Sequence, residues 1–286
     1  VSLVGDEEAK ITGISSLANY KEGSLTWIKP GTDIGENQKV ALTAVVLSKE
    51  IDVSASVKFY VNNPKFFFFK AAELLAGSSN NAVIAPSAVL SESAKIGKGV
   101  SIGPYSCIGK NTVIGENTQI GSHVIIENDV IVGNNCCIKS GAIIGGKGFG
   151  YSKVDDLYFP IPHYGGIVIG NYVDIGSNTC IDKGTLDNTI IKDGVKIDNL
   201  CHIAHNVIIE ENCCIVANTT IGGSVKISKG SYVGISASIQ NQKKIGTGSI
   251  VGMGAVVTKD VLENHVVAFS PARVIRKRTQ TDFEKY

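Results

Sequence analysis

Histidine is the side chain best suited to move a proton near neutral pH, and the chain has five: His123, His163, His202, His205 and His265. His205 differs from the others in its surroundings, CHIAHNVII, and in having Gly223 eighteen residues further on. If the two face each other, the glycine leaves room for a substrate, and its N–H could donate to a developing oxyanion. The imidazole could accept the proton of an amine that attacks a thioester. We therefore interpret His205 and Gly223 as a candidate catalytic pair, with Asp182, Asp198 or Asn199 as candidates to orient the imidazole.

The offset of eighteen is informative because the chain repeats every six residues. Aliphatic side chains recur at each sixth position from Ile84 to Ile144, from Ile169 to Ile181, and from Ile191 to Val257. This step fits neither an amphipathic helix nor plain strand alternation. It is typical of a prism in which three short strands make one coil of three times six residues. We predict a mainly β chain: a left-handed parallel β-helix of hexapeptide repeats, its hand taken from the repeat class, preceded by a small α/β domain.

The repeat also predicts the domain boundaries. Residues 1–78 lack the six-residue period and contain strand-like runs followed by a helix that begins at Pro64, which suits a first helical turn. Residues 79–262 form the β-helix, interrupted by an extruded loop at 145–166 that is rich in aromatic residues. Residues 263–286 form a basic C-terminal tail.

Composition excludes several classes of protein. The net charge is +1, with 27 basic and 26 acidic residues and no basic stripe, so nucleic-acid binding is not expected. No apolar run approaches the roughly 20 residues of a membrane span. Seven cysteines without a CxxC pair argue against a disulfide framework and favour the cytoplasm.

Two other functions are less well supported by the sequence. A carbonic-anhydrase-like protein would need three zinc-binding histidines, whereas His202 and His205 lie only three residues apart and no third histidine lies eighteen residues away. We therefore predict no metal. A purely structural repeat protein would not need the additional α/β domain and the aromatic loop.

Several segments resemble the UDP-3-O-acylglucosamine N-acyltransferase family of lipid A synthesis, over nearly the whole chain. They are ITGISSL, SLTWIKPG, VNNPKFFFFKAAELL, GFGY, IPHYGG and TCIDKGTLDNTIIKDGVKIDNLCHIAHNVII. The resemblance implies that His205 is the general base and that the Gly223 amide is the oxyanion donor. It also implies a homotrimer with its sites between neighbouring prisms. The residues that we assign to the acceptor sugar nucleotide are Trp27, Phe149, Gly150, Tyr151, His163, Asp198 and Asn199.

The chain departs from the family pattern at three places. IQNQKKIG puts Asn241 and Gln242 where the family has a second site histidine. Trp27 and Pro30 stand where the family has an aromatic residue followed by the asparagine that clasps uracil, which leaves uracil or thymine open. The chain ends VVAFSPARVIRKR, which is similar to coenzyme-A-dependent sugar acetyltransferases.

These departures suggest how the acyl donor binds. Arg273, Arg276, Lys277 and Arg278 gather charge suited to the phosphates of coenzyme A or to an acidic acyl carrier protein. We assign Gly223, Asn241, Gln242, Arg273 and Arg276 to the donor. The predicted function is N-acyl transfer from an acyl thioester, with acyl-CoA favoured, to a UDP- or dTDP-linked amino sugar. The alternative is the lipid A enzyme itself, with acyl carrier protein as donor; neither requires a cofactor.

Overall fold

The computed structural model describes residues 1–32, 41–48, 51, 53–77 and 82–285. The chain divides into two compact units, Val1–Asn80 and Asn81–Tyr286. The domain boundary expected between residues 78 and 79 lies outside the described residues. Within the described part, no helix is long and apolar enough to cross a membrane.

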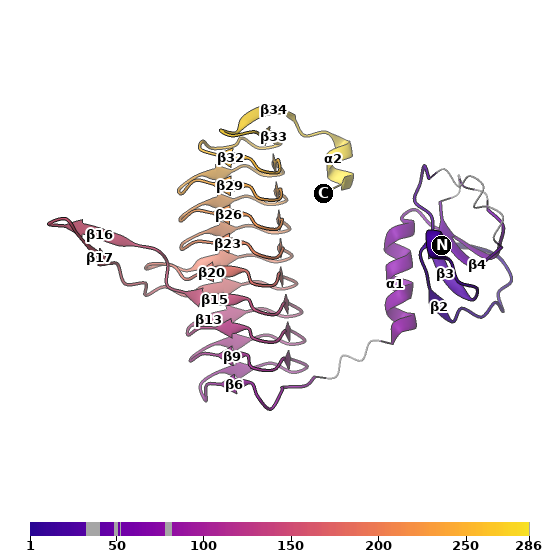
Figure 1. The fold of residues 1–286 in the computed structure, drawn as a ribbon, viewed down its shortest axis with the longest axis horizontal. Helices are drawn as coiled ribbons and strands as arrows, with labels where there is room; N and C mark the ends of the chain where they lie inside the picture. The colour runs from indigo at the N-terminus through magenta and orange to yellow at the C-terminus, as the bar shows by residue number, and fades with distance from the viewer. Residues whose placement is uncertain (33–40, 49–50, 52, 78–81, 286) are drawn as a thin grey trace. The chain divides into compact units, whose positions relative to one another are not determined.

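The first unit is a five-stranded sheet with one helix packed against it (Figure 1). The strand order is β1-β5-β4-β3-β2, and only the pairing of β1 with β5 is antiparallel. The elements are β1 (Ser2–Gly5), β2 (Gly13–Ile14), the 3-10 turn η1 (Leu17–Asn19), β3 (Ser24–Trp27), β4 (Leu42–Leu47), β5 (Ala55–Tyr60) and α1 (Pro64–Ala76). The small α/β domain expected from the sequence is therefore present.

Helix α1 begins where the sequence predicted. The Asn63 side chain accepts a hydrogen bond from the Phe66 N–H (3.0 Å), and Pro64 occupies the first turn. The helix buries Phe68 against Leu25 and its neighbours in the sheet. Gly77, with φ of +64°, ends it in a conformation that favours glycine.

The second unit is a parallel β-helix with three sheets, one for each face of the prism (Figure 1). The nine-stranded sheet contains β6 (Val89–Leu90), β9 (Cys107–Ile108), β12 (Ile125–Ile126), β15 (Ile143–Gly146), β20 (Cys180–Asp182), β23 (His202–Ile203), β26 (Thr220–Ile221), β29 (Ser238–Ile239) and β32 (Val256–Val257). The eight-stranded sheet contains β7 (Lys95–Ile96), β10 (Val113–Ile114), β13 (Val130–Val132), β18 (Ile167–Ile169), β21 (Thr189–Ile191), β24 (Ile208–Ile209), β27 (Lys226–Ile227) and β30 (Lys244–Ile245). The ten-stranded sheet contains β8 (Ser101–Ile102), β11 (Gln119–Ile120), β14 (Cys137–Ile138), β19 (Asp174–Ile175), β22 (Lys196–Ile197), β25 (Cys214–Ile215), β28 (Tyr232–Val233), β31 (Ile250–Val251), β33 (His265–Ala268) and β34 (Arg273–Lys277).

The aliphatic ladder of the sequence is the core of this prism. Ile114 pairs with Val132, eighteen residues on, and both side chains are buried. A second inward row holds small residues such as Thr118, whose hydroxyl donates to the Gly133 carbonyl (2.9 Å) and accepts from the Cys136 N–H (3.1 Å). Each coil thus buries one large aliphatic and one small side chain per face. The predicted prism over 84–144 is confirmed, with strands and no helix in that range.

The extruded loop contains an antiparallel hairpin that interrupts the prism. Strands β16 (Tyr151–Val154) and β17 (Leu157–Pro160) pair across a turn at Asp155–Asp156, and every strand residue is exposed. The hairpin leaves after β15 of the nine-stranded sheet and returns at β18 of the eight-stranded sheet.

Residues 263–286 differ from a simple basic tail. Strand β33 pairs in parallel with β31 and extends the ten-stranded sheet, because Val266 and Val267 continue its buried positions. Strand β34 then turns back antiparallel to β33. The short helix α2 (Gln280–Lys285) follows.

Candidate active site

The candidate catalytic residues lie on one edge of the prism, where the chain passes from the nine-stranded to the eight-stranded sheet. We call this edge, from which the hairpin also leaves, the extrusion edge. His205 follows β23 there, and Gly223 follows β26 one coil further on. The His205 carbonyl accepts from the Ser224 N–H (2.9 Å), and the Gly223 carbonyl accepts from the Gln242 N–H (2.9 Å). The stacking inferred from the eighteen-residue offset is present in the structure.

Gly223 faces the imidazole of His205 directly. A Cβ atom at position 223 would lie 2.7 Å from His205 Nε2, closer than real contacts allow. The backbone of Gly223 is not in the left-handed region, so space rather than backbone conformation requires the glycine.

The N–H of Gly223 is available for hydrogen bonding. At the matching corner of an earlier coil, the Lys110 N–H donates to the Asn128 side chain one coil on (2.7 Å). Among the described residues, the Gly223 N–H has no such acceptor. It can therefore donate to a ligand oxygen placed near His205.

Asn206 sets the tautomer of His205. The Asn206 Oδ1 accepts from the Thr185 N–H (3.0 Å), and its Nδ2 donates to the Asp187 carbonyl (3.1 Å), so two backbone groups decide which way the amide points. His205 Nδ1 lies 3.0 Å from that same Oδ1. Because a carbonyl oxygen only accepts, Nδ1 carries the hydrogen, and in the neutral imidazole Nε2 then keeps its lone pair. The neutral imidazole thus presents a proton acceptor above Gly223.

His163 and the base of the hairpin lie beside His205. The two imidazoles have centroids 5.4 Å apart and rings inclined at 72°. Gly150 packs on His163, since a Cβ at 150 would lie 3.2 Å from His163 Cε1. Phe149 and Tyr151 have ring centroids 4.9 Å apart and are exposed. The structure therefore joins Gly150 and His163 to the catalytic pair, whereas Phe149 and Tyr151 are exposed and contact each other.

Comparisons with known proteins identify the family. The model "Bacterial transferase hexapeptide (six repeats)" matches residues 111–146 and 188–223. The UDP-3-O-acylglucosamine N-acyltransferase of Methylobacillus flagellatus is 36% identical over 249 residues, which cover 79% of this chain and 69% of that protein.

The chain belongs to the UDP-3-O-acylglucosamine N-acyltransferase family.

Other similarities cover shorter parts of the family or a related fold. UDP-3-O-acylglucosamine N-acyltransferase 2 of Legionella pneumophila (strain Lens) is 49% identical over 96 residues, 34% of this chain and only 27% of that protein. The solved structure of LpxA from Acinetobacter baumannii is similar with a TM-score of 0.64 at 25% identity, over 71% of this chain and 76% of that one.

Asp182 lies in the histidine cluster, whereas Asp198 and Asn199 do not. Burial raises the pKa of Asp182 above its ordinary value, and the charges of His202, His205 and His163 act in the opposite direction. Asp198 and Asn199 follow β22, at the edge between the ten- and nine-stranded sheets. There the Asn199 side chain accepts from the Ser177 N–H (2.7 Å). Within one chain they therefore do not orient His205, contrary to our expectation from the sequence. Their role in binding the acceptor stays a prediction, because the family resemblance places the sites between neighbouring prisms.

Of the residues assigned to the donor, Asn241 and Gln242 are exposed on the extrusion edge, one coil beyond Gly223.

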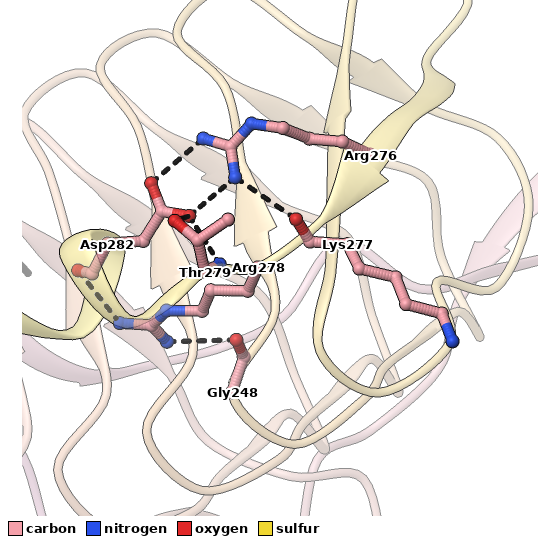
Figure 2. A network of polar contacts seen from close by, with 6 residues as sticks. All are labelled: Gly248, Arg276, Lys277, Arg278, Thr279 and Asp282. Carbon is pink, nitrogen blue, oxygen red and sulfur yellow. Dashed lines mark hydrogen bonds and ion pairs between the residues drawn. The ribbon is translucent and has the colours of Figure 1, made fainter.

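Arg276 differs from the expected donor-binding residue because it forms a two-pronged ion pair with Asp282 (Nη2 to Oδ1, 2.8 Å), as Figure 2 shows. Arg278 is also engaged, donating to the Gly248 carbonyl (2.8 Å). Arg273 is exposed on β34 and donates to the adjacent Ala272 carbonyl (3.1 Å). We call β33, β34 and α2 together the C-terminal cap. Arg276 and Arg278 thus form hydrogen bonds that stabilise this cap.

Trp27 belongs to the core of the first unit. It is half-buried, and its ring lies 6.5 Å from that of Phe68, inclined at 34°. This packing accounts for a tryptophan at the end of β3 without a ligand. Stacking of Trp27 on a nucleotide base stays a prediction.

Two functional residues were not expected from the sequence, Asn206 and Thr185. Asn206 directly follows His205, so the pair of letters HN was the available signal. Thr185 lies in the segment between β20 and β21, where the offset between paired residues increases from 18 to 22. Only the structure shows that this insertion places its N–H against the Asn206 amide.

Proposed function

We propose that the protein transfers an acyl group from an acyl thioester to the amino group of a UDP-3-O-acylglucosamine. The observation that carries this proposal is the His205 Nε2 lone pair held over Gly223, whose N–H has no acceptor among the described residues. A base and an oxyanion donor on neighbouring coils are what acyl transfer to an amine requires. The named relative with 36% identity supports the choice of acceptor.

The reaction balances with these two groups. The amine nitrogen attacks the thioester carbonyl and forms the C–N bond, while His205 Nε2 takes one of its protons. The oxyanion of the tetrahedral intermediate accepts a hydrogen bond from the Gly223 N–H. The C–S bond then breaks, and the imidazolium returns its proton to the departing thiolate, leaving an amide and a free thiol.

For the donor we favour an acyl carrier protein over acyl-CoA. The case for coenzyme A depended on the similarity of the C-terminal segment to coenzyme-A-dependent enzymes, whereas the relatives with 36% and 49% identity carry the name of the lipid A enzyme. The bonds of Arg276 and Arg278 inside the C-terminal segment weaken a role of these two residues in binding either donor. The names of the relatives also favour uracil over thymine in the acceptor. The similarity of VVAFSPARVIRKR to coenzyme-A-dependent enzymes supports the second candidate, transfer from acyl-CoA to a dTDP-linked amino sugar.

A paired assay tests the proposal. The protein is incubated with UDP- and dTDP-linked amino sugars, each with acyl-CoA and with acyl carrier protein donors, and the amide products are measured by mass spectrometry. We expect product from UDP-3-O-acylglucosamine with the acyl carrier protein. Product from the dTDP sugar and acyl-CoA alone would establish the second candidate, and no product from any pair would refute both.

The His205→Ala variant tests the mechanism. We expect kcat to fall by about 10² to 10⁴, the usual contribution of a positioned general base. Thermal unfolding and oligomeric state should be unchanged, because His205 is not part of the buried ladder. A near-normal kcat at neutral pH would show that solvent takes the proton.

A further inference from the structure

His163 is the most buried histidine of the extrusion edge, and one of its nitrogen atoms has no partner. Its side chain is only 5% exposed, whereas His205 is half-buried and His202 exposed. His163 Nδ1 lies 2.9 Å from the Ile161 carbonyl, which can only accept, so Nδ1 carries the hydrogen. In the neutral imidazole Nε2 is then an acceptor, and this buried atom has no hydrogen-bond partner among the described residues.

The position of Nε2 prevents direct contact with a substrate. A Cβ atom at Gly148 would lie 2.6 Å from His163 Nε2, 2.8 Å from His205 Cβ and 3.0 Å from His205 Cδ2. Gly148 therefore packs closely against both imidazoles where they meet. Because His163 Nε2 is buried, an acceptor sugar could reach it only after a rearrangement of the residues around it.

The same contacts restrict His205. Its Nδ1–H donates to Asn206, and its Nε2 faces Gly223. The part of the side chain that carries Cβ and Cδ2 lies against His163 and Gly148. Leaving a buried acceptor without a hydrogen bond is unfavourable, so the unpartnered Nε2 calls for an explanation. The imidazole of His205, the proposed base, packs against the imidazole ring of His163.

We propose that His163 is a positioning residue that holds His205 over Gly223 and does not bind the acceptor. The proposal rests on the proposed function and replaces the acceptor-binding role that the family resemblance implied for His163. The bond from Nδ1–H to the Ile161 carbonyl fixes the rotation of the ring. Because His163 also packs on His205, this bond connects the end of the extruded loop at Ile161 to the catalytic base.

Two substitutions separate the features of His163. His163→Asn keeps a donor for the Ile161 carbonyl but removes the ring that packs against His205. His163→Phe keeps an aromatic ring beside His205 but removes both ring nitrogens. We expect His163→Asn to lower kcat by about tenfold, because a base displaced by a fraction of an ångström loses alignment, with the KM for the acceptor unchanged. His163→Phe should retain more of the wild-type kcat.

His265 supplies a matched control. Its Nδ1 makes the same local bond, to the Glu263 carbonyl two residues earlier (2.7 Å), on β33 in the C-terminal cap. His265→Asn and His265→Phe should leave kcat and both KM values at the wild-type level. An increase of the acceptor KM in both His163 variants at unchanged kcat, or no kinetic change in either, would overturn the proposal.

A crystal structure of His163→Asn gives a readout that does not depend on the reaction. We expect the His205 imidazole to leave its place over Gly223 or to occupy two rotamers. If the variant kept His205 in its wild-type rotamer, the positioning role would be refuted even if the substrate assignment were correct. If the rotamer changed but no substrate pair gave product, the proposed function would fail and the positioning role would stand.

Discussion

At the scale of single residues, the site depends on a neutral amide rather than a carboxylate. Asn206 holds the Nδ1–H of His205 and is itself held by Thr185 and Asp187. A carboxylate next to the base would accept the same bond but would be repelled by the Asp187 carbonyl. The amide therefore satisfies one donor and one acceptor of the backbone while it selects the tautomer.

The Asn206→Ala variant tests this role. We expect kcat to fall by about tenfold to a hundredfold, part of the contribution of a positioned base, because the imidazole loses the acceptor that fixes its tautomer. Asn218→Ala is the control, since Asn218 is also a corner residue with φ of +60° and its side chain bonds to Ser236 Oγ (3.0 Å). Both variants bear the same left-handed strain. Equal losses of kcat in the two variants would remove the tautomer role of Asn206.

At the scale of elements, the C-terminal cap depends on one carboxylate. Asp282 accepts from Arg276 and from the Thr279 N–H (2.8 Å) at the start of α2, as Figure 2 shows. These contacts, chiefly the Arg276 hydrogen bond, lower the pKa of Asp282 below its ordinary value of 3.8. Because the folded pKa is depressed, the stabilisation is present above pH 3.8 and is lost as the pH falls through the folded pKa.

The Asp282→Asn variant tests this linkage. We expect a lower Tm than wild type at pH 7, and a difference that shrinks as the pH is lowered below 4. Thermal unfolding followed by circular dichroism at both pH values provides the measurement. A Tm difference that grows on acidification would contradict the sign of the effect.

At the scale of the whole molecule, the exposed hairpin suggests association. A two-stranded ribbon is marginally stable by itself in water, and all eight strand residues of β16 and β17 are exposed in the single chain. They include Tyr158, 71% exposed, and Leu157, 63% exposed. We therefore expect a neighbouring copy to cover the hairpin, in keeping with the homotrimer that the family resemblance implies.

Light scattering coupled to size exclusion measures the assembly directly. We expect the mass of three chains at micromolar concentration, because flat prism faces and an apolar hairpin favour a closed symmetric assembly. Replacing Leu157 and Tyr158 by serine should weaken the trimer without unfolding the prism, whose core they do not enter. A monomeric wild-type protein would refute the expectation.

The sequence alone determined the prism and the central pair of the site. A six-residue period is a local pattern that repeats through the chain, so it predicts the inward row of every strand and the eighteen-residue offset that stacks Gly223 beneath His205. The position of the extruded loop and helix α1 were likewise predictable, from the break in the period and from Asn63 and Pro64. The antiparallel pairing of β16 with β17 inside that loop was not predicted.

Only the tertiary structure decided the partners of the polar side chains. The acceptor for His205 Nδ1–H is oriented by Thr185, in a four-residue insertion that breaks the period. Arg276 is paired with Asp282 by the turn into α2, and Gly148, from the opposite end of the extruded loop, packs closely against His163. A periodic pattern specifies which side chains are buried in each coil. The partner of a charged or hydrogen-bonding group depends instead on where loops return, because such bonds require atoms within about 3 Å and in line.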